Sequence, residues 1–312
     1  MSTQRIAAVI LNYNSEKDIQ VCAEQIARQL NVRLSIIIVD NASRPESLDA
    51  VRSWLAEWRP NAVRGTAEEV LTWVRQNAAL AAESGRVYLI ENHENRGYSA
   101  GNNIGIRLAD ALGTVGVLIA NPDMRIEDQH YLKELSRHLF ADPLNFVAAS
   151  RIIALQGNDQ NPLREATFWE ELFWPRWYLR RFFKQISYIL SINEDKPIPV
   201  PKVSGCCMLL RMDFLRQIGY LDENVFLYCE EPILSARVHA AKGKILYVPT
   251  VTAVHAHVSS EKGNSASRML QFIKSRKYYL KTYSSYSRWQ LGLLSASYAV
   301  LKTYNRVRGG GR

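Results

Sequence analysis

Four short, predominantly apolar runs constrain the fold of this 312-residue chain more than any other feature. They are Ile6–Leu11, Leu34–Val39, Val87–Ile90 and Val115–Ala120. Because their β-branched residues follow one another without polar alternation, we expect strands that are covered on both faces. Helical stretches lie between these runs, and strand–helix alternation of this kind predicts a mostly parallel sheet in an α/β layer structure.

Two of the intervening helices can be placed from their periodicity. The first is predicted over Ser15–Leu30 and the second over Ser47–Trp58. In the first helix the apolar residues recur on one face, and they are Ile19, Ala23, Ile26 and Leu30.

Polar residues follow three of the predicted strands. They are Asn12, Asp40 with Asn41, and Asn121–Asp123. Ligands of open α/β sheets bind beyond the carboxyl ends of the strands, so these residues predict a shared polar site. The alternative is that Asn and Asp stand there only because they favour turns.

Composition allows one large domain, or one domain with an appendage, because 47% of the residues are hydrophobic. No CxxC pair occurs, so zinc-ligand spacing is missing and we expect reduced thiols in a reducing compartment. The cysteines are Cys22, Cys206, Cys207 and Cys229. No signal-peptide pattern and no run of 18 apolar residues is present, so no membrane-spanning helix is expected.

The net charge of +9 is concentrated near the carboxyl-terminal end. Between Arg268 and Arg312 there are ten Lys and Arg residues and no Asp or Glu. Such a segment favours an anionic partner, either nucleic acid or lipid headgroups, with a solvated basic face as the alternative. No nucleic-acid-binding motif accompanies the charge, so a lipid surface is the preferred partner.

The same segment has helical periodicity, and its apolar residues share one broad face. They are Met269, Leu270, Phe272, Ile273, Tyr279, Leu280 and Tyr283. An uncharged stretch between Arg288 and Lys302 is too short to span a bilayer but suits a position in its interface.

The segment Asn161–Lys184 is rich in aromatic and arginine residues and contains FWEELFWPRWYLRRFFK. One interpretation is a buried amphipathic helix. The other is an acceptor-binding or membrane-facing flap, because Trp and Tyr favour the bilayer interface. Both remain open at the level of the sequence.

Six motifs follow one another between about residues 5 and 260. They are VILNYN (Val9–Asn14), IIVDNAS (Ile37–Ser43), NRGYSAGNNIGI (Asn95–Ile106), ANPDMRI (Ala120–Ile126), the stretch Val203–Pro249, and VHAHVSS (Val254–Ser260). In this order they resemble family-2 glycosyltransferases with the GT-A fold. Within that family, the chain resembles most the bacterial rhamnosyltransferase-like group that builds cell-surface polysaccharides such as O-antigen.

The resemblance implies a set of residues that bind the nucleotide-sugar donor. Asp40 would contact the nucleobase or ribose, with Asn12 and Asn14 in the same pocket. Residues along the nucleotide and the sugar would be Asn95, Gly97, Asn102 and Asn103. The glycines of this motif are spaced by four, unlike the GxGxxG pattern, which argues against a dehydrogenase.

Transfer from a nucleotide diphosphate needs a cation for the leaving group, and Mn²⁺ or Mg²⁺ held by a carboxylate would supply it. By resemblance, Asp123 would bind that metal as the single carboxylate of a DxD-like motif that reads Asn121-Pro122-Asp123 here. His255 would be the remote metal ligand, with His257 as the alternative.

The acceptor hydroxyl needs a general base, usually a carboxylate. The family's acidic motif is Glu-Asp-x-Asp, whereas this chain has Glu230-Glu231-Pro232-Ile233. The resemblance assigns the base to Glu231, with Glu230 in an orienting or hydrogen-bonding role. Pro232 fits the first turn of a helix, which would place Glu231 at the helix amino terminus.

We therefore expect a GT-A domain over residues 1–262 and a basic, amphipathic helical extension over residues 263–312. The expected function is inverting, metal-dependent transfer of a sugar, rhamnose from dTDP-rhamnose by resemblance, to a lipid-linked glycan. The expected location is cytoplasmic and peripheral, at the inner face of the cytoplasmic membrane. The alternatives are a nucleotidyltransferase and a non-catalytic sugar-nucleotide-binding protein at the membrane surface, and the oligomeric state is left open.

Overall fold

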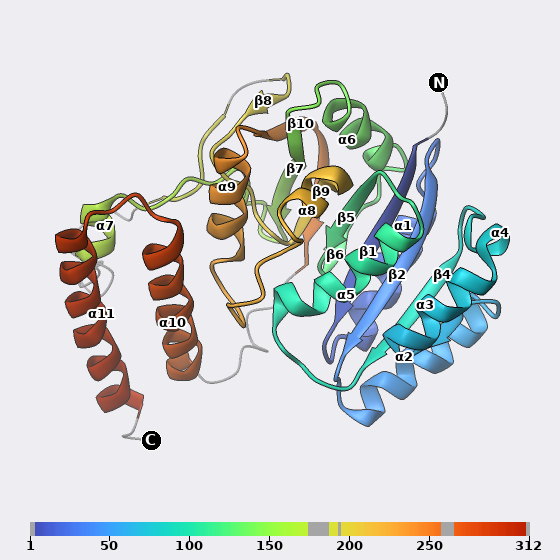
Figure 1. The fold of residues 1–312 in the computed structure, drawn as a ribbon, viewed down its shortest axis with the longest axis horizontal. Helices are drawn as coiled ribbons and strands as arrows, with labels where there is room; N and C mark the ends of the chain where they lie inside the picture. The colour runs from blue at the N-terminus through green and yellow to red at the C-terminus, as the bar shows by residue number, and fades with distance from the viewer. Residues whose placement is uncertain (1–3, 174–186, 193–194, 257–264, 310–312) are drawn as a thin grey trace.

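The computed structural model describes residues 4–173, 187–192, 195–256 and 265–309. These residues form one ten-stranded sheet with helices on both faces (Figure 1). The strand order is β3-β4-β2-β1-β5-β9-β7-β10-β6, and β8 pairs with β10.

The strands are β1 (Arg5–Asn12), β2 (Arg33–Asn41), β3 (Val63–Gly65), β4 (Val87–Asn92), β5 (Gly116–Ala120), β6 (Met124–Arg125), β7 (Asn145–Ala154), β8 (Ile198–Pro199), β9 (Cys207–Arg211) and β10 (Lys244–His255). The helices are α1 (Glu16–Ala27), α2 (Pro45–Trp58), α3 (Ala67–Gln76), α4 (Ala78–Ala81), α5 (Tyr98–Ala111), α6 (Tyr131–Leu139), α7 (Phe168–Leu172), α8 (Met212–Gln217), α9 (Glu230–Ala240), α10 (Ser265–Tyr283) and α11 (Arg288–Gly309).

The amino-terminal half of the sheet is parallel, as the apolar runs predict. β1 pairs in parallel with β2 and β5, and β4 pairs in parallel with β2 and β3. The register places Asn12 opposite Asp40, so the polar ends of β1 and β2 are side by side. Beyond β5 the sheet is mixed, because β9 runs antiparallel to both β5 and β7.

Helices cover both faces of the sheet. Buried residues of α1, α2 and α6 pack on one face, and buried residues of α3, α5, α8 and α9 pack on the other. The predicted buried face of α1 is correct for Ile19, Ala23 and Ile26. It is wrong for Leu30, which lies beyond the end of the helix and is 45% exposed.

The glycines of α5 allow this helix to approach the sheet closely. A Cβ atom at Gly101 would lie 2.6 Å from Leu11 Cδ1, and one at Gly105 would lie 2.5 Å from Val9 Cγ1. Both distances are too short for a side chain, so the spacing of four residues reflects one glycine face of α5 that packs on β1 and β2.

The carboxyl-terminal helices pack against the rest of the protein at one end of the molecule (Figure 1). α10 contacts α9 and α11, and α11 contacts α7. Phe168 of α7 is buried among Ile273 and Leu280 of α10 and Leu294 and Tyr298 of α11. The predicted helical periodicity is therefore confirmed, and its apolar face is partly covered by protein.

The other side of this helical group is exposed. Trp169 and Phe173 at α7, and Trp289, Leu293, Val300 and Tyr304 of α11, are each more than 40% exposed. We call these six residues the apolar face. No helix in the described ranges combines the length and apolarity that a bilayer crossing requires.

Candidate functional site

The ends of β1 and β2 form a buried polar cluster. Asn12 Nδ2 donates a hydrogen bond to Asp40 Oδ1 at 2.8 Å, and Asp40 Oδ2 accepts one from the Ser43 amide at 3.1 Å. The hydroxyl of Ser43 accepts a hydrogen bond from the Asn14 amide at 3.0 Å. Three of the residues expected to bind the nucleoside are thus brought together, with Ser43 connecting them.

A second cluster joins β2 to the start of α5. Asn41 Nδ2 donates to Asn95 Oδ1 at 3.0 Å, and Asn95 Oδ1 also accepts from the Gly97 amide at 3.0 Å. Gly97 has a φ of 104°, and a Cβ there would lie 2.2 Å from the carbonyl oxygen of Phe226. Only glycine fits this turn, because another residue would be both strained and in collision with the backbone.

Asn102 and Asn103 of α5 are buried and bonded to neighbouring backbone. Asn102 Nδ2 donates to the Tyr98 carbonyl at 3.0 Å. Asn103 exchanges two hydrogen bonds of 2.9 Å with the backbone of Leu221 and also donates to Glu223. Asn103 therefore anchors the segment after α8 to α5, and the donor-binding role predicted for both residues stays a prediction.

Asp123 and His255 meet at the edge of the sheet. β6, directly after Asp123, pairs antiparallel with the end of β10, and His255 lies opposite Met124. As a result, His255 Nε2 lies 3.2 Å from Asp123 Oδ2. Gln160 Oε1 lies 2.7 Å from His255 Nδ1 and orients the ring. Sequence patterns contain no signal for Gln160.

This pair fits two positions of one divalent cation. Two adjacent ligands of an octahedral ion, each about 2.1 Å from it, stand about 3 Å apart, close to the observed 3.2 Å. Mn²⁺ accepts carboxylate and imidazole together. Within the described ranges no group of three or more His, Cys, Asp or Glu side chains could hold a metal. His257, the alternative ligand, lies outside the described residues.

Glu230 and Glu231 open α9, as the position of Pro232 predicts. The chain enters this helix through two consecutive left-handed residues, Tyr228 with a φ of 70° and Cys229 with a φ of 69°. Non-glycine residues seldom adopt this conformation, and it persists where surrounding structure enforces it.

The two carboxylates have different surroundings. Glu231 Oε1 accepts a hydrogen bond from the Gly205 amide at 3.3 Å. Glu230 Oε1 is buried without a hydrogen-bond partner in the part of the chain that the structure describes. Burial, and secondly the charge of Glu231, raises the pKa of Glu230 to about 8. A raised pKa favours the protonated form of Glu230 at neutral pH, which suits the hydrogen-bonding role expected for it beside the proposed base.

A cavity of about 380 Å³ connects these groups. Asn121 and His255 line it together with Glu230, Glu231 and Tyr98. The cavity thus places the carboxyl end of β5, the end of β10 and the start of α9 around one space.

Tyr98 is a site residue that the sequence reading did not single out. Its hydroxyl donates a hydrogen bond to the carbonyl of Gly205 at 2.8 Å. Burial, and secondly the charge of Glu230, raises the pKa of Tyr98 well above its ordinary value. Tyr98 therefore keeps its proton and holds Gly205, whose amide contacts Glu231.

The family model of glycosyl transferase family 2 matches residues 7–219, which is more than half of the chain. This match confirms the resemblance to family-2 glycosyltransferases, and it covers the first four motifs and the start of the fifth. It ends before Glu230 and His255, so the family model does not cover these two candidates.

Two glycosyltransferases are similar to this chain in sequence. The low-salt glycan biosynthesis hexosyltransferase Agl10 of Haloferax volcanii is 26% identical over 258 residues, covering 80% of this chain and 66% of the relative. An N-acetylglucosaminyl-diphospho-decaprenol L-rhamnosyltransferase of Mycobacterium tuberculosis is 31% identical over 110 residues, 35% of this chain and 34% of the relative. The chain thus spans less than two thirds of either relative.

Among solved structures, the mannosyltransferase PcManGT of Pyrobaculum calidifontis, in complex with GDP-Man and Mn²⁺, superposes with a TM-score of 0.59. The identity is 17%, and the match covers 96% of this chain and 75% of the other. The GT-A fold predicted from the motifs is thereby confirmed.

Proposed function

Because the chain belongs to glycosyl transferase family 2, we propose that it is an inverting glycosyltransferase whose reaction takes place in the cavity between β5, β10 and α9. The observation that carries the proposal is the presence of His255 and Glu231 in one cavity, with Asp123 in contact with His255. A group for the diphosphate and a base for the acceptor are thus close to one reaction centre.

Asp123 and His255 would hold Mn²⁺ or Mg²⁺ on the donor side, and Gln160 would keep the imidazole oriented. When bound, the cation neutralises the charge that develops on the diphosphate leaving group. Asn12, Asn14 and Asp40 would bind the nucleoside at the adjoining ends of β1 and β2. The complex of PcManGT with GDP-Man and Mn²⁺ supports a divalent cation here.

Glu231 would act as the general base. The acceptor oxygen forms a bond to the anomeric carbon as the bond from that carbon to the diphosphate oxygen breaks, and the acceptor proton passes to Glu231. A single in-line displacement of this kind inverts the anomeric centre. The raised pKa of Glu230 favours its protonated form at neutral pH, so this residue would add little negative charge beside Glu231.

The donor would be dTDP-rhamnose and the acceptor a lipid-linked glycan in cell-surface polysaccharide synthesis. The mycobacterial relative supports this choice, since its name gives rhamnose as the sugar and a diphospho-decaprenol as the carrier.

The six residues of the apolar face would contact the cytoplasmic side of the cytoplasmic membrane. Aromatic side chains on this face suit the bilayer interface, and the basic residues of the same segment suit anionic headgroups. Residues 174–184, which continue the aromatic segment in the sequence, lie outside the described residues. A peripheral position would bring the cavity close to a lipid-linked acceptor.

A donor panel tests the proposed activity. We expect one nucleotide sugar to raise the melting temperature in the presence of Mn²⁺ and to be slowly hydrolysed to free sugar and nucleotide diphosphate. Release of pyrophosphate from a nucleoside triphosphate and a sugar phosphate would instead identify a nucleotidyltransferase. Binding of a donor without hydrolysis or transfer would identify a sugar-nucleotide-binding protein.

A further inference from the structure

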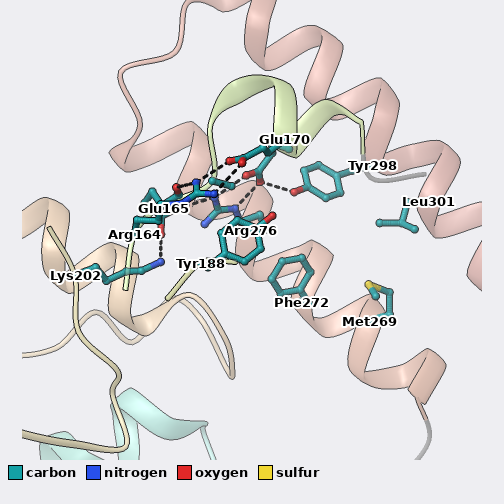
Figure 2. A pocket seen from close by; sticks show the side chains of 12 residues that line it. Arg164, Glu165, Glu170, Tyr188, Lys202, Met269, Phe272, Arg276, Tyr298 and Leu301 are labelled. Carbon is teal, nitrogen blue, oxygen red and sulfur yellow. Dashed lines mark hydrogen bonds and ion pairs between the residues drawn. The ribbon is translucent and has the colours of Figure 1, made fainter. Parts of the chain in front are cut away.

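A second cavity of about 220 Å³ lies between the carboxyl-terminal helices and the chain before α7. Figure 2 shows its lining, with a charged group at one end and apolar side chains of α10 and α11 at the other. Neither the expected donor residues nor the proposed base lines it.

The charged end is internally neutralised. Arg276 contacts Glu171 at 2.7 Å and Glu165 at 2.8 Å, and Glu165 also pairs with Lys202. A further pair joins Arg164 to Glu170 at 2.8 Å. Three cations thus face three carboxylates.

These pairs limit what the charged end can bind. A phosphate would meet no excess positive charge there. Sugar hydroxyl groups would have to displace hydrogen bonds that are already made, and breaking one side of a buried ion pair is costly.

The opposite end is apolar. Met269 and Phe272 of α10 and Leu301 of α11 supply it, and Tyr298 turns its hydroxyl away to Glu171 (Figure 2). A hydrocarbon chain is stabilised when its surface leaves water for such an apolar lining, and it needs no polar partner there.

The second cavity adjoins the reaction cavity. Lys202, Phe272 and Arg276 line both of them. A molecule bound in the second cavity would therefore lie next to the cavity that Glu231 lines.

We propose that the second cavity binds the first part of the hydrocarbon chain of a lipid-linked acceptor. This inference rests on the proposed transferase function and adds to it the place where the lipid enters. The head group would occupy the reaction cavity, and the chain would pass Phe272 toward Met269 and Leu301.

The proposal can be tested by isothermal titration calorimetry, which measures the affinity of the full chain for two probes. The probes are farnesyl phosphate and N-acetylglucosamine 1-phosphate. We expect farnesyl phosphate to bind at least tenfold more tightly than the sugar phosphate. Met269→Trp, which fills the apolar end, should weaken farnesyl phosphate binding at least tenfold. Ala166→Leu is a smaller filling change in the same lining, should Met269→Trp fail to fold. Ser295→Trp, at an exposed position of α11 outside the apolar face, is the matched control and should bind like the wild type.

Equal affinity of wild type and both filling variants for farnesyl phosphate would overturn the proposal. So would a loss of sugar phosphate binding equal to that of farnesyl phosphate, because the cavity would then be a sugar site. Donor hydrolysis, measured on the same preparations, distinguishes a failure of the lipid-site proposal from a failure of the proposed transferase function. Filling-sensitive farnesyl phosphate binding without donor hydrolysis would leave the lipid site standing and contradict the transferase function.

Discussion

His255 Nε2 lies 3.2 Å from Asp123 Oδ2, although one residue ends β10 and the other follows β5. The short antiparallel pairing of β6 with β10 creates this contact, and Gln160 fixes the imidazole from the other side. A carboxylate and an imidazole held in this way would supply two ligands of the proposed metal site.

Asp123→Ala should abolish transfer while the fold survives, because the diphosphate loses its cation. Gln160→Leu should weaken Mn²⁺ binding by about tenfold to a hundredfold, since it removes only the group that orients His255. Mn²⁺ titration of activity and circular dichroism check both variants. Full activity in excess chelator would contradict the metal-dependent mechanism.

Glu231→Gln should lower turnover at least a hundredfold, because general-base catalysis contributes about 10² to 10⁴ in rate. Donor affinity should stay nearly unchanged, since the amide keeps the shape of the carboxylate. Glu231→Asp should retain partial activity. Steady-state kinetics with a soluble acceptor check this, and wild-type turnover in Glu231→Gln would refute the assignment. If Glu230→Gln alone were inactive, the base would be Glu230.

Glu230 should make stability depend on pH. Its pKa is raised to about 8 in the folded protein, so between its ordinary pKa and pH 8 the unfolded chain releases a proton that the folded chain keeps. Stability from this group is therefore complete at low pH and is lost as pH rises through 8. The melting temperature of Glu230→Gln minus that of the wild type should therefore increase from pH 5 to pH 9. Glu57→Gln, at an exposed position, is the control, and the same pH trend in both variants would contradict this explanation.

The apolar face should hold the protein on anionic vesicles. Removing residues 268–312 is not a clean test, because Arg276 and Tyr298 contact Glu171 in the interior. The double variant Trp289→Ser, Val300→Ser changes two side chains that are 61% and 62% exposed, so it should release the protein without unfolding it. Co-sedimentation with phosphatidylserine vesicles at two salt concentrations measures the effect. Unchanged binding would mean that this face does not contact the membrane.

Arg276→Leu should destabilise the protein by about 3–5 kcal/mol, because it leaves the buried carboxylate of Glu171 without its ion-pair partner. The side chains of Arg276 and Glu171 are only 8% and 3% exposed. Arg151→Leu breaks an exposed pair with Asp159 and should cost less than about 1 kcal/mol. Urea denaturation of both variants gives the comparison, and equal losses would show that burial does not strengthen the inner pair.

Local patterns determined the first half of the fold. The apolar runs predicted β1, β2, β4 and β5, because continuous β-branched residues suit strands covered on both faces. The limits of periodicity are visible at Leu30, which continues the pattern of α1 but lies beyond its end. A one-dimensional pattern records which side of a helix is apolar, but not where the helix stops.

The order of the motifs identified the family. The same resemblance predicted Asp123 and His255 as metal ligands and Glu231 as the general base. Only the tertiary structure showed that Asp123 contacts His255 and that Gln160 forms a hydrogen bond with His255. It also showed that Arg276 lines both cavities. Each of these contacts depends on strand pairing or helix packing between distant segments. Periodicity and local propensity carry no information about such pairings, because their energy arises only when the whole chain has folded.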